Sequence, residues 1–296
     1  MIRLHILMLW LIALLCLFGA VVVLLAGTSP SGNRPESLAG AQFAALTGGA
    51  IRYQSAGRGP RTVLFLHGFN QHLGIWDDAW ARLGNCPVRL IRIDLPGFGE
   101  SHFDSNDFGL AAQSERLIEL LDALHIDRVT VVGSSMGGSL AVWLAAQYPQ
   151  RVEQLGLLAP SGYPGSLQYG GVFGRLLQPG RVKTMATWLA GTRPYKGLFP
   201  RSMLLQALTV TADYGEAWLE QLKKVQAPTL VAWSPGDRTA HAQAAESVAA
   251  NLADGTLYWL DEQAGHVLPI TRPDFTAQAA CLLGQGVAPR EIAAGE

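Results

Sequence analysis

The chain alternates short, mostly apolar runs with longer segments in which apolar residues recur every three or four positions. The first pattern predicts strands buried on both faces, and the second predicts amphipathic helices. Strands are expected at 62–66, 88–93, 129–132, 152–158, 229–233 and 256–260, and helices at 111–124, 242–252 and 275–283. This alternation is typical of an α/β fold with a doubly wound, mostly parallel sheet. Two further runs, 41–46 and 51–54, predict a leading antiparallel hairpin.

The alternation stops between residues 163 and 225, where the pattern is mainly helical, interrupted by glycine and proline, and rich in aromatic residues. Ligands of doubly wound sheets bind at the carboxyl ends of the strands, and this segment is inserted after such an end. We therefore expect a helical cap whose aromatic residues line an apolar pocket or form a small core of their own. The predicted core then has two parts, 41–162 and 226–285, followed by a loose polar tail, 286–296.

Residues 6–26 form an apolar run of 21 positions without a charge. About 20 apolar residues are enough for a helix to cross a bilayer. We interpret residues 1–27 as an uncleaved membrane anchor, a single transmembrane helix, rather than a signal peptide, because the run is long and a poor cleavage site follows it. Residues 28–40 are then a flexible tether. Arg3 precedes the run, and Arg34, which follows it, is offset by Glu36. The small excess of positive charge before the run weakly favours a catalytic domain on the extracytoplasmic side.

Composition narrows the classes of partner. The 296 residues are enough to bury one large α/β core. A net charge of −1 gives no basic surface, so nucleic acid is not an expected partner. Of the three cysteines, Cys16 lies in the apolar run, and Cys86 and Cys281 are either one pair or, as we expect, two free buried thiols. The sequence does not indicate the oligomeric state.

A catalytic serine is predicted where the apolar run 129–132 breaks into Gly-Ser-Ser-Met-Gly-Gly and then into a helical pattern. This places the motif G-x-S-x-G between a strand and a helix, as a nucleophile elbow requires. Ser135 on so tight a turn has a strained backbone, and side chains at Gly133 or Gly137 would collide with it. The following helix directs its first N–H groups toward the hydroxyl, so the Met136 N–H is a candidate oxyanion donor. The alternative is that the G-x-S-x-G motif occurs by chance, because the chain contains 33 glycines.

Serine needs a neighbouring base, and the base needs an orienting carboxylate. Asp237 follows the strand 229–233, and His266 follows the strand 256–260. Both positions are at the sheet edge where such catalysts collect, and the chain order Ser, Asp, His is that of α/β enzymes with this elbow. The alternatives are a surface loop histidine and an aspartate that only forms a Pro-Gly-Asp turn. We predict a triad of Ser135, His266 and Asp237.

Together these motifs resemble the α/β-hydrolase fold superfamily, in its capped esterase and lipase-like branch. The resemblance covers about residues 51–283 and rests on the following stretches: His67-Gly68-Phe69, Asp94-Leu95-Pro96-Gly97-Phe98-Gly99-Glu100-Ser101, Gly133-Ser134-Ser135-Met136-Gly137-Gly138, Gly236-Asp237 and Gly265-His266. The resemblance implies that the Phe69 N–H joins the Met136 N–H in the oxyanion hole. It implies that His67 is a structural loop residue and that Asp94 belongs to a turn at the rim of the site. No cofactor and no metal are implied.

The resemblance favours a serine hydrolase that cleaves carboxylic esters of apolar acyl chains, with a small-molecule ester or lipid as substrate. An anchor, an apolar cap and the Ser-Met-Gly-Gly elbow together are similar to membrane-anchored monoacylglycerol lipase-like hydrolases. One alternative is a hydrolase of carbon–carbon bonds in ring-cleavage products, but members of that branch usually have Trp after the catalytic His, where this chain has Val267. Acyl transfer on the same triad and a ligand-binding receptor with a hydrolase fold are further alternatives.

Overall fold

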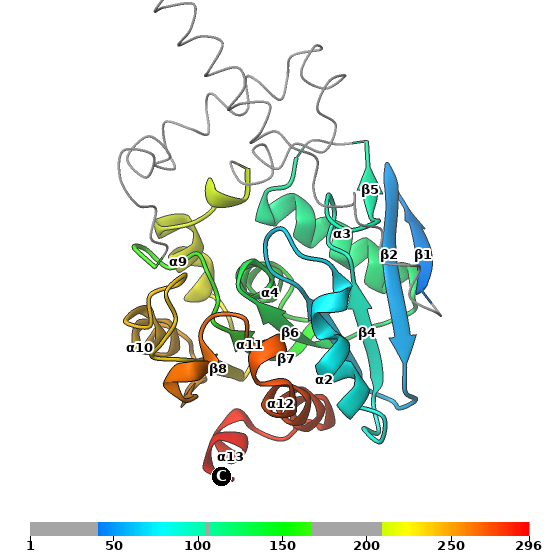
Figure 1. Ribbon diagram of the computed structural model, residues 1–296. Helices are drawn as coiled ribbons and strands as arrows, with labels where there is room; N and C mark the ends of the chain where they lie inside the picture. Colours follow the sequence, from blue (N-terminus) through cyan, green and yellow to red (C-terminus); the bar gives the residue numbers. More distant parts are fainter. Residues whose placement is uncertain (1–40, 105–106, 167–208, 296) are drawn as a thin grey trace, which may run out of the picture.

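The computed structural model of the chain describes residues 41–104, 107–166 and 209–295. Within them, nine strands form one sheet in the order β1-β2-β4-β3-β6-β7-β8-β9, with β5 paired to β2 (Figure 1). The strands are β1 (Ala41–Leu46), β2 (Gly49–Ala56), β3 (Thr62–Leu66), β4 (Arg89–Ile93), β5 (His102–Phe103), β6 (Val129–Ser134), β7 (Val152–Leu158), β8 (Thr229–Trp233) and β9 (Gly255–Trp259).

The sheet is mostly parallel. From β4 to β9, each neighbouring pair is parallel, whereas β2 is antiparallel to β1, β4 and β5. The register sets Leu66 opposite Gly133 and Ser134 opposite Leu158, so β3, β6 and β7 end at the same edge. The prediction of a mostly parallel α/β sheet is confirmed, and the loops after these strands lie together.

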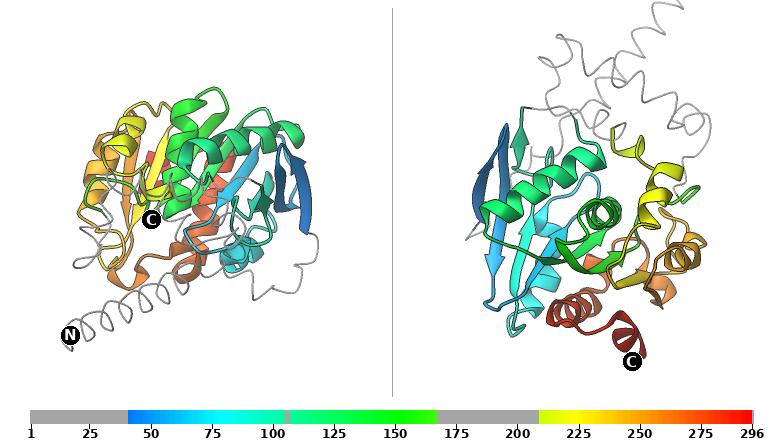
Figure 2. Two further views of the ribbon diagram at one scale, coloured as in Figure 1. Left: turned by 90° about the horizontal axis from the view of Figure 1, so that it is seen from above. Right: turned by 180° about the vertical axis from the view of Figure 1, so that it is seen from behind.

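Helices cover both faces of the sheet, as Figure 2 shows. The helical elements are η1 (Leu73–Trp76), α2 (Asp77–Arg82), α3 (Leu110–Ala123), α4 (Met136–Gln147), α9 (Glu216–Leu222), α10 (Ala244–Ala250), η2 (Glu262–Ala264), α11 (Leu268–Thr271), α12 (Pro273–Gln285) and α13 (Pro289–Ala294). Buried residues of α3, α4, α9 and α10 form one hydrophobic cluster with the sheet, and those of α2 and α12 form another. The sheet therefore separates two apolar layers.

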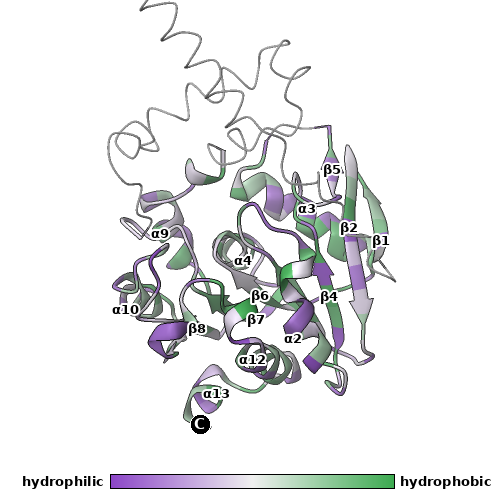
Figure 3. Ribbon diagram, viewed as in Figure 1, coloured by the Kyte–Doolittle hydropathy of each residue, from purple (hydrophilic) through white to green (hydrophobic). Residues whose placement is uncertain are grey.

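Strand β3 shows why a wholly apolar run is needed in this position. Leu64 and Leu66 belong to the cluster of α3 and α4, while Val63 and Phe65 belong to the cluster of α2 and α12. Successive side chains of a strand point to opposite faces, so every position of β3 is buried. Each such side chain stabilises the fold by about 1.5–3 kcal/mol. In Figure 3 the hydrophobic colours lie on the central strands, and hydrophilic segments lie on the outer helices α2 and α10.

Several elements differ from the sequence-based expectation. Residues 73–82 form η1 and α2, to which the apolar pattern assigns no element. The tail expected to be loose contains α13, which begins at Pro289 and buries Ile292 against Leu230 and Leu283. A single apolar side chain in a six-residue helix is too weak a periodic signal to predict that contact.

Two predictions fall largely outside the described residues. The apolar run 6–26 lies there entirely, and of the predicted cap only 163–166 and 209–225 are described. No helix in the described part of the chain is long and apolar enough to cross a membrane.

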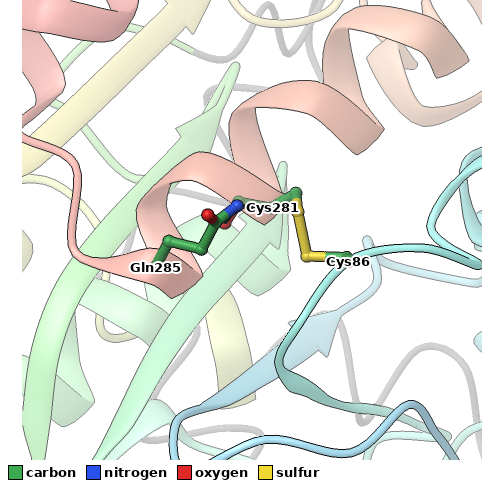
Figure 4. Close-up of a disulfide and its surroundings, with 3 residues drawn as sticks. All are labelled: Cys86, Cys281 and Gln285. Carbon is green, nitrogen blue, oxygen red and sulfur yellow. Dashed lines mark hydrogen bonds between the residues drawn. A yellow bond between two sulfur atoms is a disulfide. The ribbon is translucent and has the colours of Figure 1, made fainter.

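A disulfide joins Cys86 to Cys281, with 5.8 Å between their Cα atoms and 195 positions between them in sequence. Figure 4 shows Cys281 on helix α12 and Cys86 on the loop that follows α2. Gln285, one turn further along α12, donates a hydrogen bond from Nε2 to the Cys281 Sγ at 3.2 Å. The expectation of two free buried thiols was wrong. Sequence alone does not reveal that the packing of α12 on α2 brings these two residues together.

Candidate active site

Strand β6 ends and helix α4 begins with a single residue, Ser135, between them. Its φ of 52° and ψ of −116° lie in a region that residues with a side chain rarely adopt, at a cost of about 1–3 kcal/mol. The glycines around it are needed for close packing. A Cβ on Gly133 would collide with the carbonyl of Gly137, and a Cβ on Gly137 would collide with the carbonyl of Leu66. The local structure is that of a nucleophile elbow.

The structure brings Ser135, His266 and Asp237 into one chain of hydrogen bonds. The His266 Nε2 lies 2.9 Å from the Ser135 Oγ, and the His266 Nδ1 lies 2.7 Å from the Asp237 Oδ2. A carboxylate only accepts, so the proton of the neutral imidazole lies on Nδ1 and Nε2 accepts from the serine hydroxyl. The Asp237 side chain is fully buried, and that of His266 is 13% exposed.

Two backbone groups fix the carboxylate of Asp237. Its Oδ1 accepts hydrogen bonds from the N–H of Thr239 at 2.8 Å and from that of Ala240 at 2.9 Å. The other oxygen, Oδ2, is left for His266. The short turn after β8 therefore both presents and orients the carboxylate.

Ser234 is a site residue that sequence reasoning missed. It is the first residue after β8, and its hydroxyl donates to the carbonyl of Asp261 at 2.7 Å. The same oxygen accepts from the N–H of Gly236 at 3.2 Å and from that of Gly265 at 3.1 Å. One buried hydroxyl thus ties the loop that carries Asp237 to the loop that carries His266. Only its position directly after a strand could have drawn attention to it.

The two predicted oxyanion donors each follow a residue at the elbow: Met136 follows Ser135, and Phe69 follows Gly68, which packs on Ser135. Met136 is the first residue of α4, and the first N–H groups of a helix have no partner within the helix. Gly68 lies so close to Ser135 that a Cβ there would be 3.3 Å from the Ser135 Cβ. Its N–H donates to the Gln71 Oε1 at 2.8 Å, which holds the loop before Phe69. The role of the Phe69 and Met136 N–H groups stays a prediction.

His67 is fully buried beside this loop. Its Nδ1–H donates to the carbonyl of Gly68 at 2.7 Å, and its Nε2 accepts from the N–H of Leu95 at 2.9 Å. Burial lowers the pKa of His67 to about 4, although Asp94 opposes the shift. Both ring nitrogens are engaged with backbone and the ring is neutral, so the contacts agree with a structural role for His67 rather than that of a second base.

Asp94 organises the turn after β4. Its carboxylate accepts from the N–H of Leu73 at 2.7 Å and from that of Glu100 at 2.9 Å, and it pairs with the buried Arg52 at 3.5 Å. Gly99, with a φ of 53°, packs directly on the carboxylate. Phe98 from the same turn contacts the Phe69 ring edge to face, with centroids 5.5 Å apart. The turn held by Asp94 therefore packs against Phe69, and its place at the rim of the site stays a prediction.

No group of three or more His, Cys, Asp or Glu side chains in the described segments is placed to hold a metal ion. His72, His102, His125 and His241 take no part in the triad contacts given above. His72 caps η1 by accepting from the N–H of Gly74 at 3.1 Å.

Known proteins resemble the chain in sequence and structure. A dihydrolipoyllysine-residue acetyltransferase component of the acetoin cleaving system from Cupriavidus necator is 35% identical over 46% of this chain and 36% of its own length. The first relatives are thus matched over only about a third of their length. The monoacylglycerol lipase abhd6-A of Xenopus laevis is 26% identical over 73% of each chain. The crystal structure of a bacterial membrane phospholipase A superposes with a TM-score of 0.66 at 24% identity, covering 97% of this chain and 99% of the other.

The sequence model of the alpha/beta hydrolase fold matches residues 61–217, which is more than half of the chain and includes β3 to β7 with the elbow. The sheet order, the elbow and the position of His266 after β9 agree with that match. The chain therefore belongs to the α/β hydrolase fold family.

Proposed function

We propose that the chain is a serine hydrolase that cleaves carboxylic esters of apolar acyl chains. The observation that carries the proposal is His266 bridging the hydroxyl of Ser135 and the buried carboxylate of Asp237. A hydroxyl in this arrangement has a general base within reach, and that base has a fixed tautomer. The monoacylglycerol lipase and the phospholipase A similar to this chain act on lipid esters by their names, which supports the choice of substrate.

In the proposed reaction, the Ser135 Oγ attacks the ester carbonyl while the His266 Nε2 takes its proton. The negative oxygen of the tetrahedral intermediate accepts hydrogen bonds from the N–H groups of Phe69 and Met136. The imidazolium then gives its proton to the departing alcohol, and an acyl-enzyme on Ser135 remains. Water, deprotonated by His266, attacks this ester and releases the carboxylic acid. Asp237, buried and held by two N–H groups, stabilises the imidazolium in both halves.

An apolar acyl chain is favoured by apolar side chains on the two loops that carry Phe69 and His266. The rings of Phe69 and Phe98 pack against each other beside the loop of the proposed oxyanion hole. Val267 follows the catalytic histidine, and Ile270, four residues after it, is 54% exposed. The accessible parts of Phe69, Val267 and Ile270 give an acyl chain a surface on which to leave water, and the fully buried Phe98 supports the ring of Phe69. In the sequence, the proposed helical cap, 163–225, separates the core parts 41–162 and 226–285. The described segments on its two sides meet where the Gly215 N–H donates to the Gly162 carbonyl at 2.8 Å.

A fluorophosphonate probe and p-nitrophenyl esters from acetate to palmitate test the proposal on detergent-solubilised protein. Ser135→Ala should lose labelling and lower kcat by about 10⁶-fold. Ser134→Ala, which changes the neighbouring serine of β6, is the matched control and should retain both. We expect the rate to rise toward longer chains. Labelling that persists in Ser135→Ala refutes the assigned nucleophile, and labelling without ester turnover redirects the search to carbon–carbon bonds or acyl transfer.

We also propose that residues 1–27 anchor the protein in a membrane and that the catalytic domain lies on the extracytoplasmic side. The run 6–26 without charge supports the anchor. The disulfide between Cys86 and Cys281 supports the location, because disulfides persist in oxidising compartments. The full chain should stay in the membrane fraction after a carbonate wash, and a variant without residues 1–27 should not. A membrane-impermeant probe added to intact cells should label the enzyme. If the probe labels it only after the cytoplasmic membrane is lysed, the catalytic domain lies on the cytoplasmic side and the proposed orientation is refuted.

A further inference from the structure

The carbonyl oxygen of Ser135 accepts hydrogen bonds from two backbone groups. The N–H of Ser139, one turn along α4, lies 3.1 Å away, and the N–H of Ser161 lies 3.2 Å away. The second donor comes from a different part of the chain, the segment that connects β7 to the predicted cap, 163–225, called the insertion below. The nucleophile is therefore held from outside its own elbow.

The same peptide unit carries the Met136 N–H. In a planar trans peptide the C=O and the following N–H point in opposite directions, so fixing the oxygen of Ser135 fixes the direction of the Met136 N–H. Donors on the oxygen also polarise the N–H, because hydrogen bonds in a chain strengthen one another. Ser161 is thus placed to improve the proposed oxyanion donor without touching the substrate.

Ser161 is itself held by a chain of hydroxyls. The Ser139 Oγ donates to the Ser161 carbonyl, the two serine hydroxyl oxygens lie 3.1 Å apart, and the Ser161 Oγ lies 2.8 Å from the Tyr214 Oη. The Ser139 Oγ also lies 3.3 Å from the Ser135 carbonyl oxygen. Since both carbonyl contacts use the Ser139 proton, the Ser161 hydroxyl can donate to the Ser139 Oγ and accept from the Tyr214 hydroxyl.

Tyr214 comes from the other end of the insertion. The next residue, Gly215, donates its N–H to the Gly162 carbonyl at 2.8 Å. The ring of Trp218 packs on Gly162, where a Cβ would lie 3.0 Å from it, and its Nε1 donates to the Ser139 carbonyl at 3.1 Å. Both ends of the insertion therefore meet beneath the elbow.

We propose that Tyr214 is a positioning residue for the reaction: its hydroxyl, through Ser161, holds the Ser135–Met136 peptide in the orientation that stabilises the oxyanion. The inference rests on the proposed function, because it concerns the same nucleophile. It adds that residues 213–218 regulate how well the Met136 N–H is oriented toward the oxyanion, since any movement of these residues acts on Ser161.

The test compares Tyr214→Phe, which removes one hydroxyl, with Tyr163→Phe, a tyrosine of the same region that is not one of these hydroxyls. Tyr214→Phe should lower kcat about 10-fold, less than the loss of a direct donor, with KM unchanged. The rate of fluorophosphonate labelling of Ser135 should fall by a similar factor, and Tyr163→Phe should change neither. The Ki of a trifluoromethyl ketone, which places an oxyanion in the hole, should rise in proportion.

A double variant separates positioning from simple loss of stability. Ser161→Ala should reduce kcat as Tyr214→Phe does, and the two changes together should cost no more than either alone. Additive losses, or a lower melting temperature with an unchanged kcat and Ki, would overturn the inference. Ser135-dependent labelling of the wild-type chain is measured in the same series, so a failure of the proposed function appears as its absence and is distinguished from a failure of this inference.

Discussion

Removing the disulfide between Cys86 and Cys281 should lower the free energy of unfolding by about 5 kcal/mol, because a cross-link over so long a loop restricts the unfolded chain most. The two cysteines are 195 positions apart, and that separation enters the loop-closure entropy logarithmically. For a core of this size, the loss corresponds to a melting temperature lower by about 10–20 °C. The double variant Cys86→Ala/Cys281→Ala tests the value by urea or thermal unfolding.

Chemical reduction gives an independent measurement. The disulfide lines a surface hollow of about 480 Å³, together with Arg82, Asn85, Asp274 and Gln278, so a small reductant can enter. Wild-type protein in dithiothreitol should unfold like the double variant, and the double variant should not respond to dithiothreitol. If thiol titration shows two newly released thiols and the unfolding midpoint does not move, the reasoning from loop entropy is refuted.

Activity at low temperature should survive the same change. Cys86 precedes β4, and the backbone of Arg89 pairs with that of Arg61 just before β3, so the disulfide lies near the amino ends of the parallel strands. Ser135 follows β6, at the opposite end of the strands. The cross-link therefore contributes to stability at a distance from the proposed chemistry. A large fall in kcat at a temperature where both proteins are folded would contradict that separation.

Two further changes test the packing around the elbow. Because burial lowers the pKa of His67 from 6.5 to about 4, its contribution to stability is complete above pH 6.5 and is lost as the pH falls toward 4; between pH 7 and pH 5 the loss is about 2 kcal/mol. His67→Asn should reduce that slope, measured by unfolding at both pH values. Gly137→Ala should cost about 3 kcal/mol and most of the activity, because its Cβ meets the Leu66 carbonyl, whereas Gly84→Ala, which meets nothing, should have little effect on unfolding.

Strands were predictable from the sequence because burial on both faces leaves a run with few polar residues. The predicted ranges 62–66, 152–158 and 229–233 have the bounds that the structure gives for β3, β7 and β8. The helix 244–250 is shorter than the predicted 242–252, because its first residues form turns. An apolar pattern predicts which residues are buried more reliably than it predicts the residue at which a helix begins.

Candidate residues of the site were predictable because each one follows the end of a strand. What the sequence does not contain is which polar groups hold them, since Ser234 and Ser161 are ordinary loop serines until the fold brings their partners near. The disulfide was missed for the same reason: its cysteines are far apart in sequence, and only the contact between α12 and the loop after α2 joins them. Pairings between distant segments are a property of the tertiary structure.

The strained backbone of Ser135 explains why its distant partners matter. Its positive φ costs about 1–3 kcal/mol. Its N–H donates to the Leu158 carbonyl at 3.0 Å, and its own carbonyl accepts from Ser139 and Ser161. Each such hydrogen bond contributes a net of about 0.5–1.5 kcal/mol, so the three together are of the size needed to offset the strain. Two of the three involve Leu158 at the end of β7 and Ser161 just before the proposed cap, and the backbone geometry of Ser135 therefore depends on the segment that leads into that cap.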